Sequence, residues 1–168
     1  MLIRHCTPAE LDEVCAVVND AAVAYRGIVA ADQWKDPYMS RSELREEVED
    51  GVVFWGAFQD DDLLGVMGLQ HVDGVALIRH AYTRTASQGR GIGAALLRHV
   101  GRQTDRPVLV GTWAAAAWAI RFYQSHGFRL VAAREKDALL RHYWTIPLRQ
   151  IEESVVLADA RWFARAEA

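Results

Sequence analysis

The sequence predicts an α/β fold with a mixed, mostly antiparallel, twisted central sheet of about seven strands, flanked by about four helices. Three strand-like segments, 52–59, 63–72 and 75–83, follow one another as a meander. A glycine-rich loop comes next, and helix-like and strand-like segments then alternate. No repeat, linker or low-complexity tract interrupts the 168 residues, so we expect a single domain over 1–168, with 159–168 as a C-terminal tail.

The N-terminal part predicts one strand and two helices. Met1–Cys6 is a short apolar segment that we expect to form the first strand. Two capping boxes, Thr7-Pro8-Ala9-Glu10 and Ser40-Arg41-Ser42-Glu43, mark helix starts. The second helix is expected to stop at Asp50-Gly51. Between the helices, Tyr25–Met39 has no helical period and is rich in aromatic residues, which predicts a loop.

Turn residues separate the three strands of the meander. Asp60-Asp61-Asp62 follows the strand-like segment Val52–Gln59. Asp73-Gly74, between Leu63–Val72 and Val75–Thr83, is a strong signal for a two-residue hairpin. These three strands are therefore expected to pair antiparallel in sequence order.

The second half of the chain predicts alternating elements after the glycine loop. The last strand could pair within the chain or across a dimer, and the same residues could instead continue a helix. The expected elements are a helix from Ile92 to about Val100, a strand at Pro107–Thr112, a helix at Ala114–His126 capped by Gly127, a strand at Phe128–Ala132, a short helix at Asp137–Trp144 and a strand at Ser154–Ala158.

Composition excludes several classes of function. The formal net charge is −3, so no broad basic surface and no nucleic-acid partner are expected. Cys6 and Cys15 belong to no ligand pattern, so no metal site is expected. There is no N-terminal hydrophobic segment of the signal type and no apolar run of about 18 residues. We therefore expect a cytoplasmic protein with no membrane partner.

The loop Gln88-Gly89-Arg90-Gly91-Ile92-Gly93 holds three glycines within five residues, between a predicted strand and a predicted helix. Without Cβ atoms in the way, consecutive N–H groups can converge on an anion. The N-terminus of the following helix adds a partial positive charge, and Arg90 adds a formal one. This pattern predicts a phosphate-binding loop.

Three other interpretations of the loop are possible. A Walker loop needs Gly-Lys-Ser/Thr, which is absent. Gly89–Ala94 does fit the dinucleotide fingerprint, but Val108–Thr112 lacks the acidic residue expected roughly 20 residues on. An antiparallel meander upstream also disfavours that fold. A tight helix-entry turn with no ligand is the third alternative.

Two motifs make the sequence resemble the GNAT superfamily of N-acetyltransferases. Gln88-x-x-Gly91-x-Gly93 stands for the family's Q/R-x-x-G-x-G/A signature. The segment Ala119–Phe128 resembles the family's A-x-x-F/L-Y-x-x-x-G-F segment, at a fitting distance along the chain. The resemblance covers Leu2 to about Leu157 and is strongest from Val75 to Phe128. It implies the GNAT fold and an acyl-CoA-dependent N-acetyltransferase.

The resemblance implies acetyl-CoA as cofactor, with CoA as the product. Backbone groups of the predicted strand at Ala81, Tyr82 and Thr83 would pair with the pantetheine amides. A free N–H near Thr83 could stabilise the oxyanion that forms on attack, and one such donor is typically worth about 3–4 kcal/mol. The pyrophosphate would be bound by the N–H groups of Gln88, Gly89, Arg90, Gly91, Ile92, Gly93 and Ala94.

Tyr123 matches the family's tyrosine, which lies near the cofactor sulfur, and this match implies a catalytic proton donor to the leaving thiolate. The alternative is a tyrosine that only packs in the core, because Phe122, Tyr123 and Phe128 form an obvious apolar cluster. Cys6 and Cys15 lie outside both motifs, which favours direct transfer over a covalent enzyme intermediate.

The sequence departs from the family pattern at two places. Ala116 stands where many members carry Asn, so one anchor for the cofactor arm is lost or replaced. Leu77 and Arg79 stand where many members carry Glu or His on the third meander strand. No general base is therefore apparent on the expected face of that strand.

The absence of an apparent general base affects which acceptor amines the protein could use. A lysine-like amine, with a pKa of about 10.4, costs roughly 4–5 kcal/mol to deprotonate at pH 7, whereas an α-amine costs only about 1 kcal/mol. A weak base therefore suits an amine of low pKa. The nearest imidazoles are those of His71, His80 and His126, and each is more simply explained as a structural group. By alternation His80 lies on the side of Ile78, away from Arg79, unless a bulge resets the register.

The resemblance places the acceptor site beside the loop Tyr25–Tyr38, Trp113 and the segment Tyr143–Arg149. We single out Tyr25, Trp34, Arg79 and Trp113 as candidate substrate-binding residues. Ordinary packing for the aromatic residues and a solvated surface for the arginine are the alternatives. Further cationic side chains that could attract an anionic acceptor are Arg141, His142 and Arg149.

The sequence thus predicts transfer of an acetyl group from acetyl-CoA directly to an amine of a small molecule or peptide. A CoA-binding regulatory or sensor domain of GNAT fold, with little turnover, is the alternative that the missing base keeps open. A dinucleotide-dependent oxidoreductase is disfavoured. The acceptor, the acyl length and the existence of a homodimer are left open.

Overall fold

The computed structural model describes residues 1–165, which fall into two compact units. The first unit holds Met1–His71 and Ile78–Asp105, and the second holds Val72–Leu77 and the chain from Arg106 onward. The seven strands form one mostly antiparallel sheet in the order β1-β2-β3-β4-β5-β7-β6. Strand β4 is divided between the two units after Leu77.

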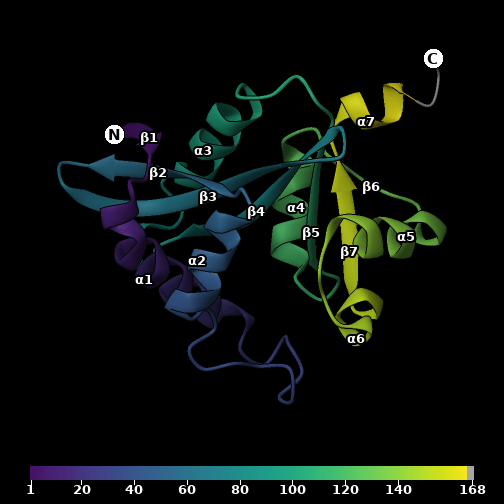
Figure 1. Ribbon diagram of the computed structural model, residues 1–168, viewed down its shortest axis with the longest axis horizontal. Coiled ribbons are helices and arrows are strands. Elements are labelled where there is room, and N and C mark those ends of the chain that lie inside the picture. Colours follow the sequence, from purple (N-terminus) through teal and green to yellow (C-terminus); the bar gives the residue numbers. More distant parts are fainter. Residues whose placement is uncertain (166–168) are drawn as a thin grey trace. The chain divides into compact units, whose positions relative to one another are not determined.

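The first unit is built from the predicted meander and three helices. Figure 1 shows α1 and α2 on one side of β2 and β3, and α3 on the other. The elements are β1 (Leu2–His5), α1 (Leu11–Ala22), α2 (Arg41–Glu49), β2 (Val53–Gln59), β3 (Asp62–Val72), β4 (Val75–Thr83, with its first three residues in the second unit) and α3 (Ile92–Gly101).

Both predicted capping boxes are confirmed. Thr7 and Glu10 close the first box ahead of α1, and Ser40 and Glu43 close the second at the start of α2. The second helix ends at Glu49, and Gly51 follows with a φ of +95°, as the predicted stop requires. Each box satisfies N–H groups that the first helical turn leaves unpaired.

The core of the first unit lies between its sheet and the pair α1 and α2. Helical spacing brings one apolar stripe of α1 against the strands, and Leu44 is the buried residue of α2. The buried residues of this cluster are Val14, Cys15, Val17, Val18, Met39, Leu44, Val52, Phe54, Phe58, Leu63 and Val66.

The second unit is an antiparallel arrangement around the last strand of the chain. Strand β7 pairs with both β5 and β6, so the predicted final strand is confirmed and pairs within the chain. Besides residues Val72–Leu77, the elements are β5 (Val108–Trp113), α4 (Ala117–Ser125), β6 (Arg129–Leu130), α5 (Ala133–Tyr143), α6 (Leu148–Glu152), β7 (Ser154–Ala158) and α7 (Ala160–Ala164).

The Asp73-Gly74 hairpin has a φ of +42° at Asp73 and +84° at Gly74, the two positive values that a type I′ turn needs. The core of this unit is formed by Val75 and Leu77 with residues of β5, α5, α6 and β7. The predicted turn is therefore confirmed, and the three strands of the meander are neighbours in sequence order in the sheet.

Three expectations for the second half need correction. The predicted strand at Phe128–Ala132 is only Arg129–Leu130. The Phe128 N–H donates to the Tyr123 carbonyl at the end of α4, at 3.1 Å, whereas the Val131 N–H still donates to the Val156 carbonyl of β7, at 2.9 Å. The helix expected from Asp137 begins at Ala133, after an N-cap residue, Ala132, whose side chain cannot cap. The short helices α6 and α7 were not predicted, and α7 lies within the expected tail. The last three residues of that tail lie outside the described residues.

The Arg4–Glu10 pair fastens β1 to the start of α1. Arg4 donates two hydrogen bonds to the Glu10 carboxylate, at 2.6 and 3.0 Å, and the Thr7 N–H donates a third at 2.7 Å. The hydrogen bonds from Arg4, followed by the one from the Thr7 backbone, hold the pKa of the Glu10 carboxyl at about 2. The folded protein therefore binds a proton at Glu10 less readily than the unfolded chain does.

We expect Glu10→Gln to lower the free energy of unfolding at pH 7, by no more than about 1 kcal/mol for so exposed a pair. Because the folded-state pKa is depressed, this stabilisation is complete above about pH 4.3 and is lost as the pH falls toward about 2. Urea unfolding of wild type and variant between pH 7 and pH 2.5 measures it, and the difference should shrink across that window. A difference independent of pH would contradict the assignment. Glu46→Gln, on an exposed face of α2, serves as the control.

Candidate active site

The glycine loop turns twice through the left-handed region. Gly89 has a φ of +75° and Gly91 a φ of +76°, and Gly91 is the N-cap of α3. No atom lies within 4 Å of the place where a Cβ atom would stand on either glycine. The first bond of the helix runs from the Ala95 N–H to the Gly91 carbonyl at 3.0 Å, so the N–H groups of Ile92, Gly93 and Ala94 have no intrahelical acceptor. This backbone fits an anion of phosphate type.

Side chains tie the loop to the end of β4 and to α1. The Gln88 amide donates to the Thr83 carbonyl at 3.3 Å. The Thr85 N–H donates to the Asp20 carboxylate at 2.6 Å. The Arg90 guanidinium turns to Gln59 of β2, at 2.9 Å. The structure thus brings the predicted strand residues Ala81–Thr83 and the predicted loop residues together in one unit.

Strand β4 is irregular at His80, which has a φ of +51°. Left-handed backbone is unusual for a residue other than glycine and interrupts the alternation of side chains along a strand. Arg79 and His80 consequently reach the same carboxylate, that of Glu47 on α2, at 2.8 and 3.3 Å. The expectation that His80 points away from Arg79 by simple alternation is therefore wrong. The structure has instead the irregular register that was named as the exception.

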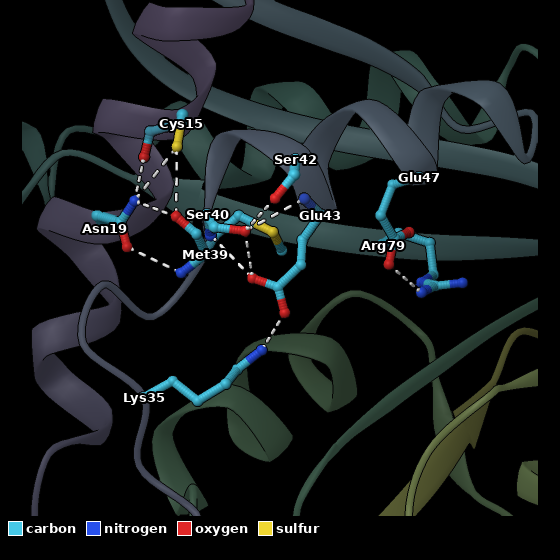
Figure 2. A network of polar contacts seen from close by, with 9 residues as sticks. All are labelled: Cys15, Asn19, Lys35, Met39, Ser40, Ser42, Glu43, Glu47 and Arg79. Carbon is cyan, nitrogen blue, oxygen red and sulfur yellow. Dashed lines mark hydrogen bonds and ion pairs between the residues drawn. The ribbon is translucent and has the colours of Figure 1, made fainter.

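Glu47 is a half-buried carboxylate with two basic neighbours. Burial raises its pKa, but the His80 imidazole and the charge of Arg79 outweigh burial and hold the pKa of the Glu47 carboxyl below its usual range. Arg79 also donates to the Gln70 side chain at 2.9 Å. Figure 2 shows Arg79 turned toward Glu47. Arg79 therefore brings no unmatched positive charge to the site.

Aromatic side chains gather beside this cluster on the α1–α2 side. Tyr25 and Tyr38 are stacked with ring centroids 6.4 Å apart, and Tyr82 of β4 meets both edge-on, at 6.3 and 6.4 Å. Trp34 packs on Tyr38 at 5.5 Å, and the Arg26 guanidinium lies over the Trp34 ring at 5.3 Å. The structure brings the predicted acceptor residues Tyr25 and Trp34 together, and Tyr38 and Tyr82 complete the group.

Polar contacts hold the C-terminal part of the aromatic loop (Figure 2). Asn19 of α1 exchanges two hydrogen bonds with the Met39 backbone, at 2.8 and 2.9 Å, and donates to the Cys15 carbonyl at 2.9 Å. Four residues before Met39, Lys35 pairs with Glu43 of the capping box. The loop is therefore pinned by side chains and not by regular secondary structure.

Tyr123 and Trp113 belong to the second unit. Tyr123, on α4, is 5% exposed and packs against the rings of Phe122 and Phe128, with centroids 5.1 and 5.6 Å away. Trp113 ends β5 opposite Ser154. Ala116, where the family pattern has Asn, is fully buried at the head of α4.

Two of the other cations expected at the acceptor site, His142 and Arg149, have acidic partners nearby. His142 lies 3.2 Å from the Asp73 carboxylate, and Arg149 lies 3.3 Å from Glu153 one helical turn on. His71 lies 3.1 Å from the Thr104 hydroxyl, and His126 lies 2.7 Å from the Phe122 carbonyl. His71 and His126 thus each have a hydrogen-bonding partner within the first or the second unit.

Sequence reasoning missed Glu47 and Gln70. The signal for Glu47 was its place three residues after Leu44, the buried position of α2, because residues three apart share a helix face. Nothing local marks Gln70, which lies on β3 and is 9% exposed. Within residues 1–165 no group of three or more His, Cys, Asp or Glu side chains could hold a metal ion, and no helix there is long and apolar enough to span a bilayer.

Comparison with known families agrees with this geometry. A model described as an acetyltransferase (GNAT) domain matches residues 15–143, more than half of the chain. The protein is therefore an acyltransferase that depends on an acyl-CoA. More particularly, the chain belongs to the GNAT family of acetyltransferases, whose acetyl donor is acetyl-CoA. No curated protein matches it in sequence.

Solved structures share the fold at low identity. The PaiA N-acetyltransferase of Thermoplasma acidophilum, in complex with coenzyme A, is 18% identical over 94% of this chain and 97% of that one, with a TM-score of 0.70. A GNAT acetyltransferase of Staphylococcus aureus is 16% identical over 94% and 97%, with a TM-score of 0.69. The ribosomal-protein-alanine N-acetyltransferase of Brucella melitensis is 18% identical over 95% and 99%, with a TM-score of 0.63.

We expect Gly91→Ala to weaken CoA binding roughly 5- to 30-fold, because a Cβ atom at a left-handed residue costs about 1–2 kcal/mol. Calorimetric titration with CoA measures this. Gly101→Ala is the matched control, since Gly101 lies at the other end of α3 with nothing within 4 Å of its Cβ position. Equal CoA affinity in both variants would argue against anion binding at this loop.

We expect Asn19→Ala to lower the free energy of unfolding by about 1–3 kcal/mol, because the Met39 N–H loses its acceptor next to a buried side chain and the Met39 carbonyl loses a donor. Urea unfolding measures the loss. Glu13→Gln, an exposed change on the same helix, should change the stability by less than about 0.5 kcal/mol. Similar values for both variants would mean that the loop is not held through Asn19.

Proposed function

We propose that the protein transfers the acetyl group of acetyl-CoA directly to an amine nitrogen of a small molecule or peptide. The observation that carries the proposal is the pair of left-handed glycines, Gly89 and Gly91, at the head of α3. Bound there, acetyl-CoA supplies a thioester carbonyl open to attack and a thiol leaving group. The N–H groups of Gly89 to Ala94 would hold its pyrophosphate, and the backbone of Ala81, Tyr82 and Thr83 would hold its pantetheine arm.

The cysteines support direct transfer without an acyl-cysteine intermediate. Burial, reinforced by the charge of Glu10, raises the pKa of the Cys6 thiol to about 12. Burial also raises the pKa of Cys15. Since the thiolate is the nucleophilic form, neither residue is activated at neutral pH.

The aromatic group of Tyr25, Trp34, Tyr38 and Tyr82 is our candidate for the acceptor-binding site. Aromatic faces attract an ammonium ion and also pack against its apolar neighbours. The Trp34 indole N–H is buried and makes no hydrogen bond to a described residue, so it is available to an acceptor oxygen. Arg79 would act here only through Glu47, because its charge is already matched. Trp113 stays a prediction.

We assign to Tyr123 the proton that the leaving sulfur requires. A positioned general acid contributes typically about 10²–10⁴-fold. Its buried place between Phe122 and Phe128 would fix the ring and limit its access to water. A homodimer and a cytoplasmic location stay predictions from the sequence.

The test is amine-dependent release of CoA thiol from acetyl-CoA, with amino acids, polyamines, aminoglycosides and short peptides as acceptors. We expect at least one amine to stimulate release, and Tyr123→Phe to lower kcat about 100-fold or more while leaving the affinity for CoA unchanged. Gln124→Ala, an exposed change on the same helix as Tyr123, is the control and should keep its activity.

Two outcomes would overturn the proposal in different ways. Tight CoA binding with no amine-stimulated release would favour a CoA-binding sensor. Full activity in Tyr123→Phe would still support acetyl transfer, but it would show that Tyr123 is not the proton donor and only packs in the core.

A further inference from the structure

We propose that His80 is the catalytic group that takes the proton from the acceptor amine, and that Glu47 is the positioning residue that holds its imidazole. The inference rests on the proposed acetyl transfer. It concerns the step for which the sequence offered no group, since Leu77 and Arg79 stand where related enzymes carry Glu or His.

The backbone gives the first reason. His80 is one of three non-glycine residues with positive φ among those described, and the other two, Asp60 and Asp73, lie in turns. Strained backbone inside a strand persists where the surrounding structure enforces it, often at functional sites. The effect here is to turn His80 toward α2, on the same side as Arg79.

The imidazole nitrogens give the second reason. His80 Nε2 is buried and lies 3.3 Å from Glu47 Oε2, yet it is not aligned as a hydrogen bond, so it has no hydrogen-bond partner among residues 1–165. Buried polar atoms rarely lack a hydrogen-bond partner. In catalytic sites, hydrogen bonds often become aligned only when the substrate binds. A carboxylate at this nitrogen favours the tautomer with the proton on Nε2. That tautomer leaves Nδ1 as the base, and no described residue donates a hydrogen bond to it.

The His80 imidazole is largely shielded from solvent and has one acidic and one basic neighbour. The His80 side chain is 15% exposed, and the Phe54 ring lies stacked at 6.0 Å. The charged groups that face it are Glu47 of α2 and Arg79 of β4. One turn earlier on α2 lies Glu43, which is paired with Lys35.

The position along β4 gives the third reason. Ala81, Tyr82 and Thr83 follow His80 directly, and these residues are our candidates for the cofactor arm. The Tyr82 ring belongs to the aromatic group assigned to the acceptor. His80 thus adjoins both proposed substrates in sequence, on the side of the sheet where Tyr25 and Tyr38 lie.

The proton count closes as follows. An acceptor that arrives as an ammonium ion loses two protons. One passes to His80 Nδ1 and then to solvent, and the other replaces the proton that Tyr123 gives to the departing sulfur. A nitrogen–carbon bond forms and a carbon–sulfur bond breaks, which leaves an amide, CoA thiol and one released proton.

The decisive measurement is kcat/KM for His80→Gln against pH, between pH 6.5 and 9.5, with acetyl-CoA and the best amine of the panel. We expect a deficit of about 100-fold near pH 7 that narrows as the pH approaches the pKa of the amine, because solvent then removes the proton beforehand. A deficit that is constant with pH, or no deficit, would overturn the proposal. His5→Gln, on β1, is the control and should show no deficit.

Glu47 has its own test, which needs no turnover. In ¹⁵N-histidine NMR spectra of the wild-type protein with CoA, we expect His80 to carry its neutral-form proton on Nε2, and Glu47→Gln to reduce that preference. The opposite tautomer in the wild type would overturn the proposal even if a variant failed to fold. If the wild-type protein acetylates an amine but His80→Gln shows no pH-dependent deficit, or the wild-type tautomer is the opposite one, acetyl transfer is still supported. Only the role of His80 is then excluded.

Discussion

The left-handed turn of β4 at His80 is the constraint on which the proposed acceptor side of the site depends. It is made sterically feasible by Gly68 on β3, where a Cβ atom would stand only 2.8 Å from the Arg79 carbonyl oxygen. The absence of a side chain at Gly68 of β3 thus leaves room for the irregular backbone of β4 at His80. Because of the turn, two adjacent residues of β4 reach the same carboxylate of α2. A regular strand would have pointed one of them to the opposite face.

The proposed acceptor side is a polar cluster of paired charges beside an aromatic group. Arg79 is matched by Glu47 and Gln70, and Lys35 is matched by Glu43. A site of this kind offers little attraction to an anionic acceptor, in contrast to the cationic site that the arginine positions suggested. If His80 accepts the proton of the acceptor amine, the argument for an amine of low pKa also weakens, because the site itself would then help to deprotonate the amine.

The parts that could be predicted from sequence are those set by local chemistry. Two capping boxes, the Asp73-Gly74 turn and the glycine loop each depend on a few adjacent residues, and each is found where it was expected. The start of α5 at Ala133 was missed because no capping side chain marks it. The conformation of His80 could not be predicted, because a neighbouring strand decides it. Glu47 was missed because its partners lie 32 and 33 positions away in the chain.

The place of β7 has a consequence for the order of events during synthesis. This strand comprises Ser154–Ala158 and lies between β5 and β6, which are made much earlier. Until it leaves the ribosome, β5 lacks one neighbour and β6 has none to pair with, and open strand edges invite pairing with other chains. All residues of the first unit are made by Asp105, so they are available to fold while the remainder is still being translated. Premature termination shortly before residue 154 would therefore yield a half-built sheet prone to aggregation.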